Sequence, residues 1–235
     1  MIRSAQFIDR YDAGRRLGVA LSTQAIGRPL IVLGLPRGGV PVGARVAEEL
    51  DAPLDAFVVR KLGVPGYEEV ALGAIASGGA RVLNQDIVDS LRIPGRVIDR
   101  VAAAEQRELE RRERTYRGGQ PFPTLSGHSV IVVDDGAATG ASMRVAITAL
   151  RELGAKSIVA ALPVASREAF RLLAAAADSC ECLVTPEPFY GVGLWYQDFS
   201  EMTDIEVRAL LGEARLRMSA GGRAASASHH SNTGT

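Results

Sequence analysis

Two adjacent carboxylates, Asp134 and Asp135, stand where an apolar run changes abruptly into a loop of small residues, in VIVVDDGAATGASM over residues 130–143. The loop offers backbone N–H groups and two hydroxyls at the expected start of a helix, which suits a phosphate dianion. Its small side chains would let the backbone approach the phosphate oxygens closely. The acids would repel a phosphate, so we expect them to bind sugar hydroxyls and a divalent cation. Together these features suggest a ribose 5-phosphate as ligand.

Other phosphate-binding motifs do not describe this loop. A Walker A loop needs a Lys before the Ser or Thr, and Ala141 stands there. The dinucleotide fingerprint G-x-G-x-x-G is absent from the expected strand–helix junctions. A phospho-receiver domain has its acidic pair near the N-terminus, without such a loop behind it. A capping or purely structural role for the two acids remains the alternative.

Strand and helix patterns alternate along the chain, which predicts an α/β fold with a mostly parallel, twisted sheet flanked by helices. Strands are expected at residues 30–35, 54–62, 130–134, 157–162 and 182–184, and helices at 40–50 and 97–116, after Gly140 and after Ser166. A first helix capped by Ser4 would carry Phe7, Tyr11, Leu17 and Leu21 on one side. A capping box, Thr203 to Glu206, would open a last short helix.

Ligands of such sheets bind beyond the carboxyl ends of the strands. This rule places three stretches at one edge: residues 35–41 (LPRGGVP), the pair Arg60-Lys61, and residues 134–142. Arg37 is then either a ligand for an anion or simply a turn residue between Pro36 and Gly38. A hairpin insertion within Gly63–Asn84 is either a mobile cover for this edge or a plain surface hairpin.

Composition indicates one domain over residues 1–212 and a disordered tail over residues 213–235. Of the 235 residues, 47% are hydrophobic, and 27 basic side chains balance 27 acidic ones, so nothing favours a nucleic-acid or membrane partner. Cys180 and Cys182 lack the spacing of a metal site and are too close to bridge well. We therefore expect a soluble, cytoplasmic protein with free thiols.

VIVVDDGAATGAS resembles the phosphoribosyl diphosphate (PRPP) binding motif of type I phosphoribosyltransferases. LPRGGVPVG resembles the pyrophosphate loop of a less characterised branch of that family, and the strand order agrees over most of residues 4–211. The resemblance implies a Mg²⁺-dependent glycosyltransferase of nucleotide metabolism and base salvage. It would transfer the 5-phosphoribosyl group of PRPP to a small nitrogenous base, release pyrophosphate, and act as a homodimer.

The resemblance also implies a role for each matching residue. Asp134 and Asp135 would be the catalytic acids, which bind the ribose hydroxyls and approach Mg²⁺. Arg37 and Lys61 would be the catalytic cations that contact the leaving pyrophosphate. The 5-phosphate would lie on Ala137, Ala138, Thr139, Gly140, Ala141 and Ser142, and the pyrophosphate on Arg37, Gly38, Gly39 and Lys61.

The acceptor base stays open. Hypoxanthine and guanine enzymes carry an Asp just before the motif Thr, and Ala138 stands here, so a 6-oxopurine handled in that way is not expected. A C-terminal aromatic hood segment could stack on the base through Phe189, Tyr190 or Trp195; alternatively, these rings pin a loop to the core or form a dimer contact. A non-enzymatic PRPP- or nucleotide-binding regulator of the same fold is the alternative to an enzyme.

Overall fold

The computed structural model of the chain describes residues 6–229. Its main sheet has five parallel strands in the order β2-β1-β6-β7-β8, which confirms the predicted α/β architecture. The strands are β1 (Leu30–Gly34), β2 (Leu54–Ala56), β6 (Ser129–Val133), β7 (Ser157–Val164) and β8 (Ser179–Val184). Because β1 and β6 are parallel neighbours, with Gly34 opposite Val133, the chain segments that follow them leave the sheet side by side.

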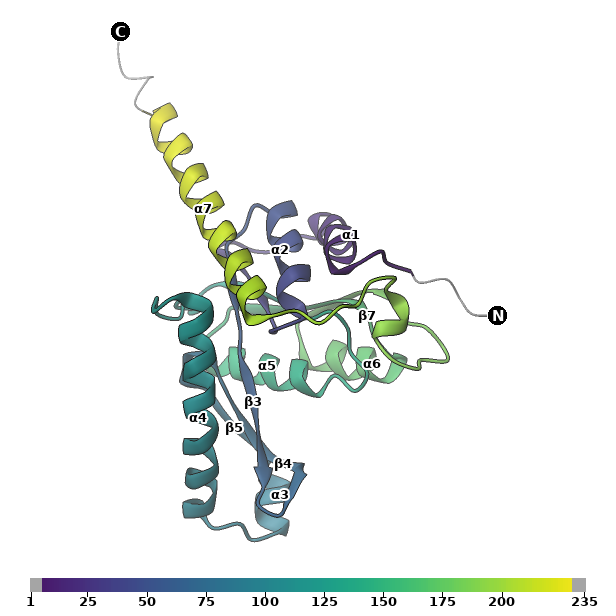
Figure 1. Ribbon diagram of the computed structural model, residues 1–235, viewed down its shortest axis with the longest axis vertical. Helices are drawn as coiled ribbons and strands as arrows, with labels where there is room; N and C mark the ends of the chain where they lie inside the picture. The colour runs from purple at the N-terminus through teal and green to yellow at the C-terminus, as the bar shows by residue number, and fades with distance from the viewer. Residues whose placement is uncertain (1–5, 230–235) are drawn as a thin grey trace.

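Helices cover both faces of this sheet (Figure 1). The helices α1 (Arg10–Ser22), α2 (Gly39–Glu49) and α7 (Asp204–His229) lie over one face, and α5 (Ala141–Glu152) and α6 (Arg167–Ala176) over the other. Successive strand residues therefore enter different cores: Val32 and Ile131 pack on the side of α2, whereas Leu33 and Val132 pack on the side of α5. Burial on both faces explains why these strands read as continuous apolar runs.

A second, antiparallel sheet extends away from the main one (Figure 1). It contains β3 (Val59–Val64), β4 (Tyr67–Ala76) and β5 (Arg81–Leu83), with a short turn η1 (Ser77–Gly79), and is followed by α3 (Gln85–Ser90) and α4 (Gly95–Arg117). The predicted hairpin is confirmed, but the single strand predicted over residues 54–62 is wrong. The Phe57 N–H still donates to Gly34 O of the main sheet at 3.0 Å, whereas the Val58 N–H donates to Ser77 Oγ at 3.0 Å. The chain thus changes sheets between these two residues.

The first helix begins later than predicted. Asp9 caps α1 by accepting a hydrogen bond from the Asp12 N–H at 2.7 Å, and Ser4 lies outside the described residues. Phe7 is not helical: it forms an isolated parallel bridge with Tyr196. The helix is therefore capped by Asp9 and not by the predicted Ser4. The residue Phe7, which was expected inside the helix, pairs instead with a distant part of the chain.

The final helix is longer than predicted. Its capping box is confirmed, since the Thr203 N–H donates to Glu206 Oε2 at 2.7 Å and the Glu206 N–H donates to Thr203 Oγ1 at 3.2 Å. The predicted boundary at residue 212 falls inside α7, and Ala214 beyond it is buried in the core. The helix runs on to His229 through the expected tail, whose last residues, 230–235, are outside the described part. Neither α7 nor any other helix within residues 6–229 combines the length and apolarity needed to cross a bilayer.

Two glycines allow α1 to pack closely on α2. A Cβ added to Gly14 would lie 2.5 Å from Val42 O, and one added to Gly18 would lie 2.7 Å from Glu49 Cβ. These approaches bring α1, with Arg10 at its start, down onto the helix that follows the first strand. The spacing of helices here is set by the absence of side chains.

We expect Gly14→Ala to destabilise the fold by about 1–3 kcal/mol, because the new methyl group overpacks this helix contact. Urea denaturation measures the change. Gly212→Ala in α7 is the matched control, since a Cβ there meets nothing within 4 Å. Its expected effect is a gain of roughly 0.5–1 kcal/mol from helix propensity. A Gly14→Ala variant as stable as wild type would show that the two helices can separate freely.

Candidate active site

The loop after β1 and the acid pair after β6 are in contact. A Cβ added to Gly38 would lie 2.0 Å from Asp135 Oδ2, and one added to Gly39 would lie 2.4 Å from Val133 O. Both positions therefore require glycine for close approach rather than for a special backbone angle. The two stretches that the sequence places at one edge of the sheet form one continuous surface. The peptide bond between Pro36 and Arg37 within this loop is cis.

The acid pair is a half-buried pair of like charges. Asp134 Oδ1 accepts a hydrogen bond from the Asp135 N–H at 2.9 Å. Burial, and then the neighbouring Asp135, raise the pKa of Asp134 well above its ordinary value. Burial also raises the pKa of Asp135, although the Arg10 guanidinium acts in the opposite direction. Holding both groups charged costs free energy that an arriving cation would recover.

Sequence reasoning missed Arg10, which is the cation beside the acid pair. Its Nε donates to Asp135 Oδ2 at 2.8 Å, and its Nη1 donates to Ser200 O at 2.8 Å. The guanidinium carbon also lies 3.9 Å from the centre of the Phe199 ring, a cation–π contact. A signal was available, because Arg10 continues the helical spacing of the buried positions Leu17 and Leu21. A charged residue in line with an apolar face indicates a buried partner.

Tyr196 is a second residue that sequence reasoning missed. Its hydroxyl donates to the Asp135 backbone oxygen at 2.5 Å, and its ring packs between Phe7 and Phe199 at centroid distances of 5.3 and 5.0 Å. Burial raises the pKa of Tyr196, so the hydroxyl keeps the proton that it donates. The backbone of Asp135 is thus fixed by the C-terminal segment.

The predicted phosphate loop is tied down at one end and open at the other. The Ala137 N–H donates to Val164 O at 3.0 Å, and Ser166 Oγ donates to Ala138 O at 2.7 Å. Within residues 6–229, no protein group accepts a hydrogen bond from the N–H of Ala138, Thr139 or Gly140. Thr139 and the first two helical residues, Ala141 and Ser142, are exposed, whereas Ala137 and Gly140 are buried. Gly140 caps α5 with a φ of 71°, which favours glycine. The loop therefore presents free amide donors at a helix N-terminus.

An open groove of about 710 Å³ adjoins this loop. Thr139, Ala141 and Arg144 line one side, and Ala74 and Asn84 of the second sheet and its margin line the other. The hairpin therefore forms a wall opposite the loop. Its role as a mobile cover stays a prediction.

The two predicted pyrophosphate cations lie in different places. Arg37 is 41% exposed beside Gly38 and forms an ion pair with Glu201. Lys61 is on β3 of the second sheet, where its Nζ donates to Glu69 O at 3.3 Å. Arg60 is engaged by Glu105 at 2.6 Å. The expectation that Lys61 ends a strand of the main sheet is wrong, because the chain changes sheets at Phe57.

The aromatic segment packs against the N-terminus of the chain. Trp195 O accepts hydrogen bonds from the N–H groups of Gln6 and Phe7 at 3.0 and 2.9 Å. Phe189 and Trp195 are partly buried against the cluster around Phe7, whereas Tyr190 is 80% exposed. The first two rings therefore help to hold this loop on the core. Tyr190 is the ring left open to a ligand.

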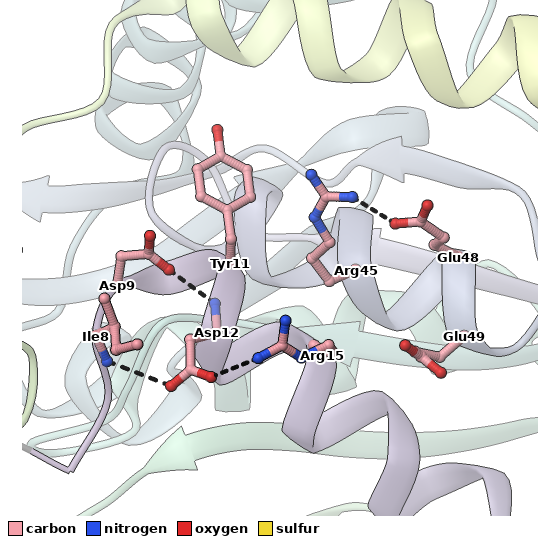
Figure 2. Close-up of a pocket in the computed structure, with 8 residues that line it drawn as sticks. All are labelled: Ile8, Asp9, Tyr11, Asp12, Arg15, Arg45, Glu48 and Glu49. Atoms are coloured by element: carbon pink, nitrogen blue, oxygen red, sulfur yellow. Dashed lines mark hydrogen bonds and ion pairs between the residues drawn. The ribbon is translucent and has the colours of Figure 1, made fainter.

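A separate cavity of about 450 Å³ lies between α1 and α2 (Figure 2). Three of its four carboxylates have partners: Asp9 caps α1, Asp12 pairs with Arg15 at 3.0 Å, and Glu48 pairs with Arg45 at 2.5 Å. The acid pair does not line it. This cavity is therefore distinct from the candidate site.

The donor set at the edge of the sheet fits Mg²⁺ that arrives with a substrate. Mg²⁺ commonly binds through one or two carboxylates together with substrate phosphates. Within residues 6–220, no basic side chain forms an ion pair with Asp134, whereas Asp135 is held by Arg10. The described residues contain no cluster of three or more His, Cys, Asp or Glu side chains suited to a resident metal. Asp134 would be the main protein ligand.

We expect Asp134→Asn to raise the melting temperature at pH 7. The folded-state pKa of Asp134 lies above its unfolded value, so ionisation destabilises the fold as pH rises, and an amide removes that cost. Each kcal/mol shifts Tm by roughly 2–4 °C in a chain of this size. The difference from wild type should shrink as the pH is lowered and native Asp134 takes up its proton. Thermal melts across pH measure this, and a lower Tm for the variant at pH 7 would contradict the assignment.

Comparison with known proteins agrees with this geometry. Residues 8–193 match the phosphoribosyl transferase domain family. Two curated proteins of Mycobacterium tuberculosis, from strains CDC 1551 / Oshkosh and H37Rv, are each 44% identical over 208 residues, and their names assign them provisionally to the phosphoribosyl transferases. The alignments cover 88% of this chain but 47% of each relative, so the chain spans about half the length of the curated relatives it matches.

A solved structure gives the same result in three dimensions. The crystal structure of TT1426 from Thermus thermophilus is 42% identical, with a TM-score of 0.79, and the match covers 88% of this chain and 98% of that chain. The family match, the parallel sheet and the meeting of the two loops at its carboxyl edge point the same way. The chain therefore belongs to the phosphoribosyl transferase domain family and has the type I phosphoribosyltransferase fold.

Proposed function

We propose that this protein is a Mg²⁺-dependent phosphoribosyltransferase that transfers the 5-phosphoribosyl group of PRPP to a nitrogenous base and releases pyrophosphate. The observation that carries the proposal is the contact of Gly38 and Gly39 with the acid pair, beside a loop with free amide donors. One surface thus offers groups for the pyrophosphate, the sugar and the 5-phosphate of the same molecule. An acid pair with only a structural role would need neither the contact with the glycine loop nor the adjacent free amide donors.

The proposed reaction breaks the bond between C1 of the ribose and a pyrophosphate oxygen as a base nitrogen forms its bond to C1. Positive charge develops on the sugar and negative charge on the leaving group, so fixed charges of opposite sign beside each would lower the barrier. Asp134 and Asp135 would hold the sugar hydroxyls, and Arg37 would face the pyrophosphate. Mg²⁺, when bound, would add positive charge to the leaving group. Lys61 stays a predicted contact of the pyrophosphate, and the second sheet that carries it would have to move toward the acid pair for this contact to form.

The acceptor is a small base whose identity stays open. Ala138 has no group that can take a proton from the base, which argues against a 6-oxopurine handled by an acid at that position. Tyr190 is exposed in the hood segment and could stack on the ring, whereas Phe189 and Trp195 pack against the core.

The two free thiols fit the cytoplasm. We also propose that the protein forms a homodimer and acts in base salvage.

A PRPP- or nucleotide-binding regulator is the second candidate. Both predicted pyrophosphate cations are engaged within the protein, Arg37 by Glu201 and Lys61 by the Glu69 carbonyl oxygen. A regulator could bind the ribose phosphate without releasing these cations for catalysis. Turnover decides between the two functions.

The combined variant Asp134→Asn with Asp135→Asn should lose PRPP binding, because the carboxylates for the sugar hydroxyls and Mg²⁺ are gone. Isothermal titration with PRPP and Mg²⁺ measures affinity, and a pyrophosphate assay with a panel of bases measures turnover. Asp99→Asn, an exposed acid on α4 paired with Arg81, is the matched control and should bind as wild type. Unchanged affinity in the combined variant would refute the placement of the ribose. If the wild-type protein binds PRPP but shows no turnover with any base, the result would support the regulator and contradict the enzyme.

The Arg37–Glu201 ion pair yields a separate prediction. Pyrophosphate must replace Glu201 as the partner of Arg37, so Glu201→Gln should bind pyrophosphate with Mg²⁺ more tightly. An exposed ion pair is worth roughly 0.2–1 kcal/mol, which corresponds to an increase of up to about fivefold. Glu187→Gln, which removes the exposed partner of Arg167, is the control. Weaker binding by Glu201→Gln would show that Arg37 does not need to be released.

A further inference from the structure

The two carboxylates of the acid pair have unequal surroundings. Asp135 Oδ2 is 2.8 Å from Arg10 Nε and lies against Gly38, where a Cβ would approach it to 2.0 Å. Its backbone oxygen is held by Tyr196. Asp134 has its neighbour's N–H as a hydrogen-bond partner and no ion pair within residues 6–220. One acid is neutralised and fixed, and the other is not.

We propose that Arg10 is a positioning residue that fixes Asp135 beside the pyrophosphate loop and leaves Asp134 as the acid whose charge is offered to the sugar and its metal ion. This inference rests on the proposed function. The two acids then have separate roles. Asp135 orients the Gly38 loop and the hydroxyl contacts, and Asp134 attracts the cation.

The contacts of Arg10 fit this role better than a packing role. Its side chain is 10% exposed, and burying a cation is costly unless its donors are used. The guanidinium uses one edge for Asp135 and another for Ser200 O, while its face covers Phe199. An ammonium group could not make all three contacts at once, because it lacks the planar fork. If only packing were needed, an apolar side chain would suffice.

The position of Arg10 also connects the acid pair to the start of α1 and to the segment before α7. It is the first residue of α1, and Ser200 follows the aromatic segment that pairs with residues 6–8. Both segments thus determine where the guanidinium lies. Without Arg10, the Asp135 carboxylate would be free to leave its position beside Gly38 and to compete with Asp134 for the cation, so both acids would be misplaced for PRPP. The loss of affinity should therefore act through Asp135.

Titration calorimetry with PRPP and Mg²⁺ on Arg10→Met, Arg10→Lys and their combinations with Asp135→Asn tests the inference. Arg10→Met should lower PRPP affinity by roughly tenfold, a coupling of the size seen for residues in one network. Arg10→Lys should recover part of the loss because it keeps the charge. In the Asp135→Asn background, Arg10→Met should have little further effect. Arg15→Met, an exposed Arg on the same helix, is the matched control and should bind as wild type.

Three outcomes would overturn the inference. The first is wild-type affinity in Arg10→Met. The second is an equal loss from Arg10→Met with and without the Asp135 carboxylate, which would show a general structural role. The third is failure of wild type to bind PRPP, which would refute the proposed function itself and is distinguishable from the other two. Melting temperatures report folding, and if Arg10→Met is unfolded, Arg10→Lys replaces it in the same pair of backgrounds.

Discussion

The buried ion pair between Arg10 and Asp135 is the interaction on which the site depends. It joins the start of α1 to the segment after β6, and through Ser200 it includes the segment after the aromatic residues. These three parts of the chain are far apart in sequence. A largely buried charged pair is weak evidence for stability, since its desolvation offsets much of its attraction. Its value lies in fixing where one carboxylate stands.

The sheet makes this possible because its strands end at a common edge. β1 and β6 are neighbours in register, so the glycine loop after one strand and the acid pair after the other meet without any long connection. Close approach then depends on missing side chains at Gly38 and Gly39, and farther away at Gly14 and Gly18. These glycines thus determine how closely the acid pair and Arg10 approach the elements around them.

The second sheet is connected to the site through α4 and α7. Tyr116 of α4 donates its hydroxyl to Asp204 Oδ1 at 2.8 Å, close to the residues that engage Arg10 and Arg37. Arg117 at the end of α4 is buried against Asp55 at 3.1 Å and reaches Ser77 at the base of the hairpin. Helix α4 therefore contacts both the base of the hairpin and the start of α7.

Much of this could be predicted from local patterns, and the failures have a common cause. Continuous apolar strands, the Ser166 cap and the box at Thr203 are short-range features, and all appear in the structure. The change of sheet at Phe57 and the pairing of Phe7 with Tyr196 depend on contacts between distant residues, which no local pattern shows. The helical spacing of Arg10 with Leu17 and Leu21 indicates a buried position, but its partner Asp135 is 125 positions away and cannot be named from a local pattern. The acid pair was found because its strand and loop are contiguous.

A crystal structure of the protein with PRPP and Mg²⁺ tests the central claim most directly. The account predicts the 5-phosphate on the N–H groups of Ala138 to Gly140, the metal ion nearer to Asp134 than to Asp135, and Arg10 still paired with Asp135. A phosphate bound away from this loop, or acids that contact neither the sugar nor the ion, would contradict it.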